Sequence, residues 1–239
     1  MNKIINSFVY QRILEGNMPN STIPAWIGET YSQCYEDVII DGVLRAHIKR
    51  QGRAPNGISY IEIGANHPVC TSASYYFQRK YGVSGILVEA NPKLIPALEQ
   101  YRPSDRIINA AVTDQDISEV TFYISPDNEI SSLDEKFVNN WKDGKVQESI
   151  TVPTIRINEL LNMLSGTEMI LLSIDVEGYD MRLLRDLDFT THRPFIIQVE
   201  PSDAYAPGTS ATMIDFLSNN NYTLIAETDV NLIFKDNTK

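Results

Sequence analysis

Two segments of the sequence each place a carboxylate after a short run of branched apolar residues. Residues 60–68 read YIEIGANHP and residues 86–91 read ILVEAN. Parallel strands of this kind end at one edge of a sheet, where Gly64 lets backbone amides approach a ligand and Glu89 can accept hydrogen bonds from both hydroxyls of a ribose. Charge-assisted hydrogen bonds contribute about 1.5–3 kcal/mol each. The pattern predicts a nucleotide-like cofactor, although strand-end glycines and carboxylates also occur in such sheets without a ligand.

The glycine spacing after the first strand bears on which cofactor this is. In a G-x-G-x-x-G register that starts at Gly64, the two later glycine positions hold Asn66 and Val69. A pyrophosphate cradle is therefore not supported, and a cofactor with an adenosine but no phosphates fits better, S-adenosylmethionine above all. An NAD(P)-dependent oxidoreductase and a catalytically inactive cofactor-binding module are the alternatives.

Four residues at the same predicted edge could move a proton or hold a cation: His67, Asp175, Glu177 and Glu200. His67 has the most suitable ordinary pKa for a general base, unless it is only a turn histidine in contact with solvent. Asp175 and Glu200 end neighbouring strands and could share Mg2+, a hard ion that favours carboxylate oxygens. No ligand spacing demands the ion, and Glu177 could equally cap the helix that follows.

Helix and strand patterns alternate along the chain. The expected strands cover residues 58–63, 85–88, 106–112, 119–124, 151–157, 169–174 and 195–199, and helices are expected at residues 33–50, 72–80, 158–164, 181–187 and 212–220, with a further one after Asn91. Residues 222–226 and 231–234 could close the sheet as an antiparallel pair. The alternation predicts an α/β fold with a doubly wound, mostly parallel sheet. The polar segment 125–148 is either a mobile loop over the site or a surface excursion.

Composition limits the classes of function. The chain has 239 residues, 43% of them hydrophobic, and a net charge of −11. This suits one domain, residues 1–239, with residues 1–52 as an N-terminal helical cover and residues 53–239 as the α/β core. The acidic balance argues against nucleic acid as a partner. No apolar run reaches the roughly 18 residues of a membrane span, and Cys34 and Cys70 form no zinc or disulfide pattern. A cytoplasmic protein is expected, and the sequence leaves homo-oligomer formation open.

A set of motifs in fixed order adds a family resemblance. The motifs are YSQ at 31–33 with ED at 36–37, IEIGAN at 61–66, VEANP at 88–92, NAAV at 109–112, SSL at 131–133 and SIDVEG at 173–178. From Tyr31 to Glu200 the chain resembles an FkbM-type methyltransferase. The resemblance implies a class I methyltransferase (Rossmann-like) sheet, S-adenosylmethionine as cofactor, and O-methylation of a hydroxyl on a sugar, glycolipid, polysaccharide or polyketide-like small molecule, as in glycan or natural product biosynthesis.

The resemblance also implies roles for individual residues. Those expected to bind the cofactor are Gln33, Glu62, Gly64, Ala65, Asn66, Thr71, Ser72, Glu89, Asn91, Asn109, Ala110 and Asp175; those expected to bind the substrate are Tyr31, Ser131, Ser132 and Glu177. His67, Asp175 and Glu200 are the catalytic candidates. Many relatives carry a glycine where this chain has Pro68. Proline removes an amide donor, so the hydroxyls of Thr71, Ser72 and Ser74 are expected to bind the methionine carboxylate instead.

Overall fold

The structure is a computed structural model that describes residues 12–17, 30–52, 57–141 and 144–239. Its centre is a seven-stranded sheet in the order β3-β2-β1-β7-β8-β10-β9. These strands are β1 (Ile58–Ile63), β2 (Ile86–Glu89), β3 (Arg106–Asn109), β7 (Glu168–Ile174), β8 (Ile196–Val199), β9 (Tyr222–Glu227) and β10 (Leu232–Asp236). Neighbours from β3 to β8 pair in parallel, and β10 pairs antiparallel with both β8 and β9. The mostly parallel sheet and its antiparallel C-terminal pair confirm the prediction.

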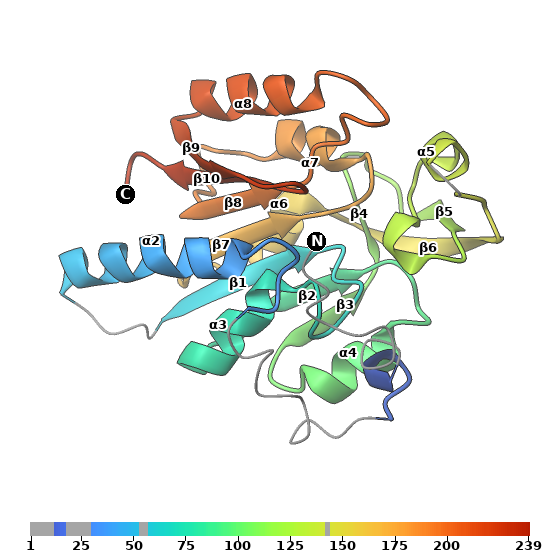
Figure 1. The fold of residues 1–239 in the computed structure, drawn as a ribbon, viewed down its shortest axis with the longest axis horizontal. Coiled ribbons are helices and arrows are strands. Elements are labelled where there is room, and N and C mark those ends of the chain that lie inside the picture. Colours follow the sequence, from blue (N-terminus) through green and yellow to red (C-terminus); the bar gives the residue numbers. More distant parts are fainter. Residues whose placement is uncertain (1–11, 18–29, 53–56, 142–143) are drawn as a thin grey trace.

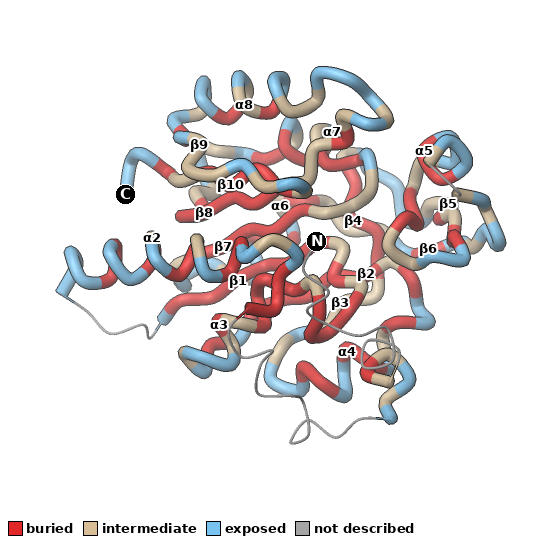
Figure 2. Tube along the Cα trace, in the orientation of Figure 1, coloured by how far each residue is buried: buried red, intermediate tan, exposed pale blue. Residues whose placement is uncertain are grey.

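Helices cover both faces of this sheet (Figure 1). One face packs against α2 (Glu36–Gln51), α3 (Ala73–Tyr81) and α4 (Ile95–Tyr101), and the other against α6 (Ile157–Asn162), α7 (Asp180–Asp186) and α8 (Thr209–Asn219). The central strands are buried along their length, as Figure 2 shows in red. Their continuous apolar sequences follow from this double cover. The division of the chain into a cover, residues 1–52, and a core, residues 53–239, stays a prediction.

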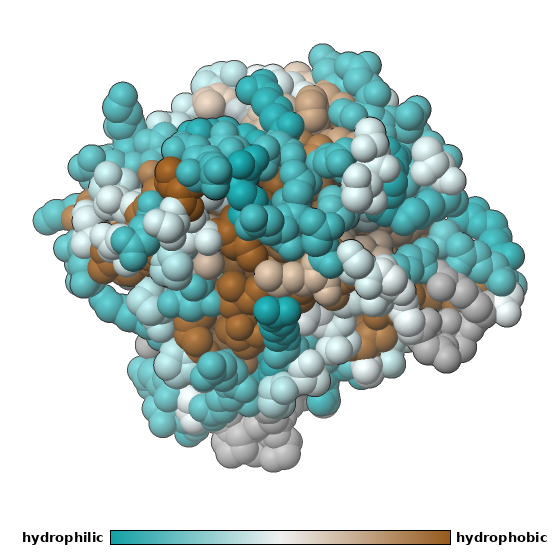
Figure 3. Space-filling view, turned by 180° about the vertical axis from the view of Figure 1, so that it is seen from behind, coloured by the Kyte–Doolittle hydropathy of each residue, from teal (hydrophilic) through white to brown (hydrophobic). Residues whose placement is uncertain are grey.

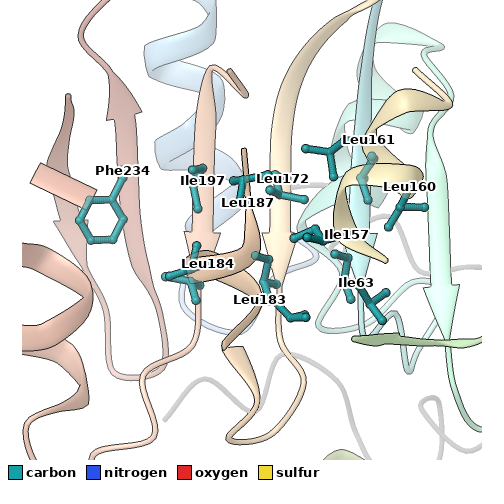
Figure 4. Close-up of a cluster of buried hydrophobic side chains, with 14 of the residues drawn as sticks. Ile63, Ile157, Leu160, Leu161, Leu172, Leu183, Leu184, Leu187, Ile197 and Phe234 are labelled. Carbon is teal, nitrogen blue, oxygen red and sulfur yellow. The ribbon is translucent and has the colours of Figure 1, made fainter. Parts of the chain in front are cut away.

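Alternation along each strand sorts the side chains between the two layers. Ile63, Leu172 and Ile197 point to the face covered by α6 and α7, where they meet Leu160 and Leu183 (Figure 4). Their immediate neighbours in sequence point to the face covered by α2 and α3. Because side chains alternate with a period of two, polar residues placed between the apolar ones all reach this second face.

The opposite side of the molecule is shown in Figure 3, where hydrophilic side chains surround a central band of hydrophobic ones. Among the described helices, none has both the length and the apolar character needed to span a bilayer.

The helix α2 begins three residues later than predicted. Asp37 accepts hydrogen bonds from the backbone amides of Tyr31 (2.6 Å) and Ser32 (3.3 Å), and from the hydroxyl of Thr30 (2.7 Å). These bonds hold residues 30–34 as a loop, and Tyr35 turns into the helix with a left-handed φ of 65°. The Ser32 hydroxyl accepts the Asp37 amide at 3.2 Å, which ties the loop to the first turn of the helix. The loop brings Ser32 and Gln33 to the end of the sheet.

The expected strand at residues 106–112 is divided between two sheets. After β3 the chain leaves the main sheet at Ala110 and continues as β4 (Ala111–Thr113), which joins β6 (Glu148–Arg156) and β5 (Glu119–Ile124) in a three-stranded sheet. The interruption lies at Asn109, the last residue of β3. Its side-chain amide donates to the carbonyls of Glu89 (2.8 Å) and Ala90 (3.1 Å) at the end of β2. Between β5 and β6, the short helices η3 (Asn128–Ile130) and α5 (Glu135–Asn140) occupy the segment predicted as a loop.

Candidate active site

The strand order reverses at β1, because β2 and β3 lie on one side of it and β7 and β8 on the other. Such a switch point leaves a crevice at the carboxyl ends of the strands. A cavity of about 1050 Å³, which includes open solvent at its mouth, lies there. Its polar wall comes from α2, β1, β2, η3, β7, β8 and β10 and the loops beside them: Ser32, Gln33, Glu36, Glu62, Asn66, Thr71, Glu89, Asn128, Glu129, Ser131, Ser173, Asp175, Glu177, Gln198, Glu200 and Asn231. Its apolar wall comprises Ile63, Ala65, Val88, Ala90, Ala110, Ala111, Val112, Phe122, Leu133 and Val176.

The cavity is strongly acidic. Seven carboxyl side chains line it: Glu36, Glu62, Glu89, Glu129, Asp175, Glu177 and Glu200. Within the described part of the chain, no Lys, Arg or His belongs to its lining. A ligand that binds here therefore meets hydrogen-bond acceptors and negative charge rather than an anion cradle.

The turn after β1 requires glycine. Gly64 has φ of 81°, and a Cβ at this position would lie 1.7 Å from the backbone carbonyl oxygen of Asp175. The amides of Gly64 and Ala65 both donate to the carbonyl of Val88, at 3.0 and 3.1 Å. The loop is thus tied to β2 on one side and to the end of β7 on the other.

Glu89 is held rigidly at the end of β2. One carboxylate oxygen accepts the amide of Asn66 at 2.8 Å, and the other accepts the amide of Asn91 at 2.7 Å. Burial raises the pKa of Glu89, and these two backbone bonds oppose the rise. Each carboxylate oxygen can still accept a further bond. The side chain is therefore fixed in place with acceptor capacity left over for a ligand.

Glu62 is supported by a second layer of polar groups. The hydroxyls of Ser72 (2.9 Å) and Ser74 donate to it. The buried guanidinium of Arg102 donates to the same two hydroxyls at 3.0 and 2.8 Å and pairs with Asp105 at 2.7 Å. Burial raises the pKa of the Glu62 carboxyl. Ser72 does not line the cavity, which corrects the expectation that Ser72 and Ser74 contact the cofactor directly: both hydroxyls are engaged with Glu62.

Thr71 does reach the cavity, at a left-handed φ of 62°, and its hydroxyl donates to the Cys70 carbonyl at 2.6 Å.

His67 lies outside the cavity lining, with none of its side chain exposed. Its Nδ1 accepts the backbone amides of Val69 (3.1 Å) and Cys70 (2.8 Å), so the lone pair of this nitrogen is already used. Neither sequence-based interpretation fits, because the ring contacts neither solvent nor the cavity. The structure gives His67 a structural role, which is to hold the turn that contains Pro68.

The ends of β7 and β8 bring three carboxyl groups together. Oxygen atoms of Asp175, Glu177 and Glu200 lie within 4.8 Å of one another. Burial together with repulsion between neighbouring carboxyl groups raises the pKa of Glu200 and of Glu177 well above the ordinary range. The cluster therefore retains protons at pH values where exposed carboxyls are ionised.

The turn that carries Glu177 has an unusual backbone. Glu177 has a left-handed φ of 54°, and Gly178 follows with φ of 90°. The buried Asp180 accepts the amides of Val176 (3.3 Å) and Gly178 (3.2 Å), and the Ser132 hydroxyl donates to the Glu177 carbonyl at 2.7 Å. Asp180 rather than Glu177 thus stabilises the start of α7, which leaves the Glu177 side chain to the cavity.

The remaining predicted residues divide into two groups. Gln33, Ala110 and Ser131 line the cavity, and the roles expected for them in cofactor and substrate binding stay predictions. Three others do not line it but support residues that do: Ser132 and Asn109 through the bonds described above, and Asn91 through its amide bond to Glu89. Tyr31 also lies outside the lining, in an edge-to-face contact with Tyr75 at 4.8 Å between ring centroids.

Sequence reasoning missed several polar residues of the wall. Ser173 and Gln198 are paired in register on β7 and β8, and Glu36 and Asn231 flank the same region. One signal could have found the first two, since each is a single polar residue inside an otherwise apolar strand, in MILLSI and FIIQV. A polar side chain buried in a parallel strand needs a partner, and a ligand is one such partner.

One family model and several solved structures resemble this chain. Residues 62–224 match the family model described as the methyltransferase FkbM domain. Among solved structures, MtNAS in complex with MTA and tNA is 10% identical, covering 95% of this chain and 68% of that one with a TM-score of 0.41. A mutant of MtNAS in complex with S-adenosylmethionine is also 10% identical, with 95% and 70% coverage and a TM-score of 0.41.

A further solved structure is Haemonchus contortus phosphoethanolamine N-methyltransferase 1 in complex with phosphoethanolamine and S-adenosylhomocysteine. It is 11% identical, covering 86% of this chain and 40% of that one, with a TM-score of 0.33. The comparison with curated proteins found no match. The family match extends over more than half of the sequence and includes the end of β1 and all of β2, β7 and β8, whose ends form the cavity. The resemblance seen in the motifs is thereby confirmed, and the chain belongs to the FkbM methyltransferase domain family.

Proposed function

We propose that this methyltransferase uses S-adenosylmethionine to methylate a hydroxyl group of a small molecule or glycan, such as a sugar, glycolipid, polysaccharide or polyketide-like compound. The observation that carries the proposal is the fixed carboxylate of Glu89, which is held by two backbone amides at the end of β2 and faces the cavity beside the Gly64 turn. Free acceptor capacity at this point suits the two hydroxyls of a ribose.

If the ribose binds to Glu89, the positions of the other parts of the cofactor follow. The apolar wall formed by Ala110, Val112, Phe122 and Leu133 suits an adenine ring. The turn at residues 64–66 lies between Glu89 and Asp175, so the methionine portion would run along it toward the acid cluster. Carboxylates there suit the ammonium and sulfonium groups, which are both positive.

For methyl transfer, the protein must mainly align the methyl group with the acceptor oxygen and provide a proton acceptor. S-adenosylmethionine supplies an electrophilic methyl group, and the acceptor oxygen loses its proton as the new O–C bond forms and the S–C bond breaks. With His67 outside the cavity, we assign the proton acceptor to the pair formed by Asp175 and Glu200. Both side chains line the cavity at the ends of β7 and β8, and their oxygen atoms lie close together there.

The two alternatives fit the cavity less well. A dinucleotide would bring a pyrophosphate into an acidic cavity whose described lining includes no cationic side chain, and like charges repel most strongly where water is excluded. An inactive binding module would not need a cluster of carboxyls with raised pKa beside the cofactor site.

The test combines binding with turnover. Calorimetry should detect S-adenosylhomocysteine binding, while NADH should not protect the protein against thermal unfolding. Transfer of a labelled methyl group to cell-extract glycans and to a panel of hydroxyl compounds should then identify the acceptor. Protection by NADH alone would favour an oxidoreductase, and tight cofactor binding without transfer to any acceptor would favour the inactive module. Cytoplasmic location and the oligomeric state stay predictions.

A further inference from the structure

One side of the cavity holds more hydrogen-bond acceptors than the described chain satisfies. The amide oxygens of Gln198 and Asn231 have no hydrogen-bond partner among the described residues, although each side chain is only 5% exposed. Both line the cavity together with Asp175, Glu177 and Glu200. A buried polar atom that is left unpaired is costly, so two such atoms beside an acid cluster point to a ligand.

Strand register explains how these oxygens come together. Ile174 pairs with Val199 in parallel, and Val199 pairs with Leu232 in the antiparallel direction. Continuing both ladders by one residue places Glu200 between Asp175 and Asn231, in a row that crosses three strands. Oxygen atoms of Asp175 and Glu200, together with one of Glu177, lie within 4.8 Å of one another.

The face of the sheet that carries Glu200 also carries Gln198, because the two are separated by two positions along one extended segment. Gln198 lies in register with Ser173 on β7. From the helix side, Glu36 contributes a further carboxylate, which accepts the Asn231 side-chain amide at 3.5 Å. Carboxylate and amide oxygens thus surround this end of the cavity from α2, β7, β8 and β10.

The donor set selects the kind of ion. The atoms are all oxygens from carboxyl and amide groups, which hard divalent cations prefer, whereas zinc and other softer metals favour His and Cys ligands. Among the described residues, no Cys or His lines the cavity. A shared proton satisfies only one carboxyl pair, while a divalent cation offsets the charge of the whole cluster and accepts amide oxygens as ligands.

We infer that Asp175, Glu177 and Glu200, together with the amide oxygens of Gln198 and Asn231, bind a divalent cation of the Mg2+ and Ca2+ class. The inference deepens the proposed function and rests on it in one respect: an ion here would lie next to the methionine end of the cofactor, where it can orient an acceptor hydroxyl. The binding itself can be measured without any acceptor.

The probe is Mn2+ added to chelator-treated full-length protein and followed by calorimetry and by electron paramagnetic resonance. We expect one bound ion, with affinity at least tenfold weaker in Asp175→Asn and in Glu200→Gln. Both variants remove repulsion from the cluster, so they should fold with a melting temperature at or above that of the wild type. The matched control is Glu119→Gln, which changes an exposed glutamate on β5 outside the cavity and should keep Mn2+ affinity.

The outcomes separate the two proposals. If the wild type binds S-adenosylhomocysteine but no Mn2+ up to about 1 mM, a range that covers weak extracellular-type sites, the ion site is refuted and the cofactor assignment stands. Equal Mn2+ affinity in the wild type, Asp175→Asn and Glu200→Gln would also refute the site. Binding of Mn2+ without any S-adenosylhomocysteine binding would support the ion site and contradict the proposed function.

Discussion

Replacement of Glu89 by alanine tests the cofactor half of the site most directly. The change removes both ribose-facing oxygens and also leaves the amides of Asn66 and Asn91 without their acceptors. Loss of one or two charge-assisted hydrogen bonds, partly replaced by water in the open cavity, predicts that affinity for S-adenosylhomocysteine falls by about 10- to 100-fold, or about 1.4–2.7 kcal/mol.

The same substitution should also lower stability. Two buried amides lose their partners, which predicts a decrease of about 1–3 kcal/mol in the free energy of unfolding. Calorimetry on protein shown to be folded separates this effect from the loss of affinity. Glu89→Gln does not repair the site, since the side-chain NH2 group would face an amide donor from Asn66 or Asn91. Glu119→Ala, an exposed glutamate on β5, is the matched control and should bind normally. An unchanged affinity in folded Glu89→Ala would remove Glu89 from the cofactor site.

Three further outcomes are expected. His67→Ala should lower the free energy of unfolding by about 1–3 kcal/mol in urea titrations, because two turn amides lose their acceptor, while turnover of the folded fraction is retained; a 100-fold loss of turnover at unchanged stability would restore His67 as the base. Gly64→Ala should abolish cofactor binding in calorimetry, since the added Cβ meets the Asp175 carbonyl, and normal binding would contradict the tight turn. Burial raises the pKa of the Asp180 carboxyl in the folded protein well above its ordinary value. The protonated carboxyl therefore stabilises the fold fully at pH values below the pKa of the unfolded chain, about 4. This stabilisation is lost as pH rises through the pKa of the folded protein. Urea unfolding from about pH 5 to about pH 8 should therefore show a steeper decline in stability for the wild type than for Asp180→Asn, and parallel curves would refute the assignment.

The sequence predicted the sheet well because its signals are local. Apolar runs such as residues 169–174 become buried strands, and the motif after Tyr60 places Gly64 in the turn that the structure requires. Helix and strand boundaries were less accurate where a distant side chain intervenes. Asp37 draws residues 30–34 into a loop, and Asn109 ends its strand by bonding to the chain beyond β2. Hydrophobic periodicity does not reveal either of these hydrogen bonds between a side chain and the backbone.

The sequence predicted several residues that line the site but not the role of each one. A strand-end position identified Glu89, Asp175 and Glu200 as residues of the cavity, since parallel strands end at one edge. The role of His67 depends on the orientation of its ring within the loop, which is set by hydrogen bonds from two backbone amides. Gln198 escaped notice because its importance comes from pairing with another strand.

The two halves of the cavity differ in how their polar groups are satisfied, and the difference suggests how they work. At the cofactor half, Glu89 and Glu62 already accept hydrogen bonds from backbone amides and from hydroxyls backed by Arg102. Such prior satisfaction fixes the geometry before any ligand arrives, which reduces the entropic cost of binding. The amide oxygen of Asn66 lacks a partner there among the described residues. At the other half, the carboxyl groups of Asp175, Glu177 and Glu200 lie close together and line the same cavity as two unpaired amide oxygens. Their electrostatic cost is relieved only when positive charge enters, so this half should respond to ions, protons and the sulfonium itself. Binding at the first half and charge balance at the second are therefore separable by substitution, although both sets of residues end adjacent strands of one sheet.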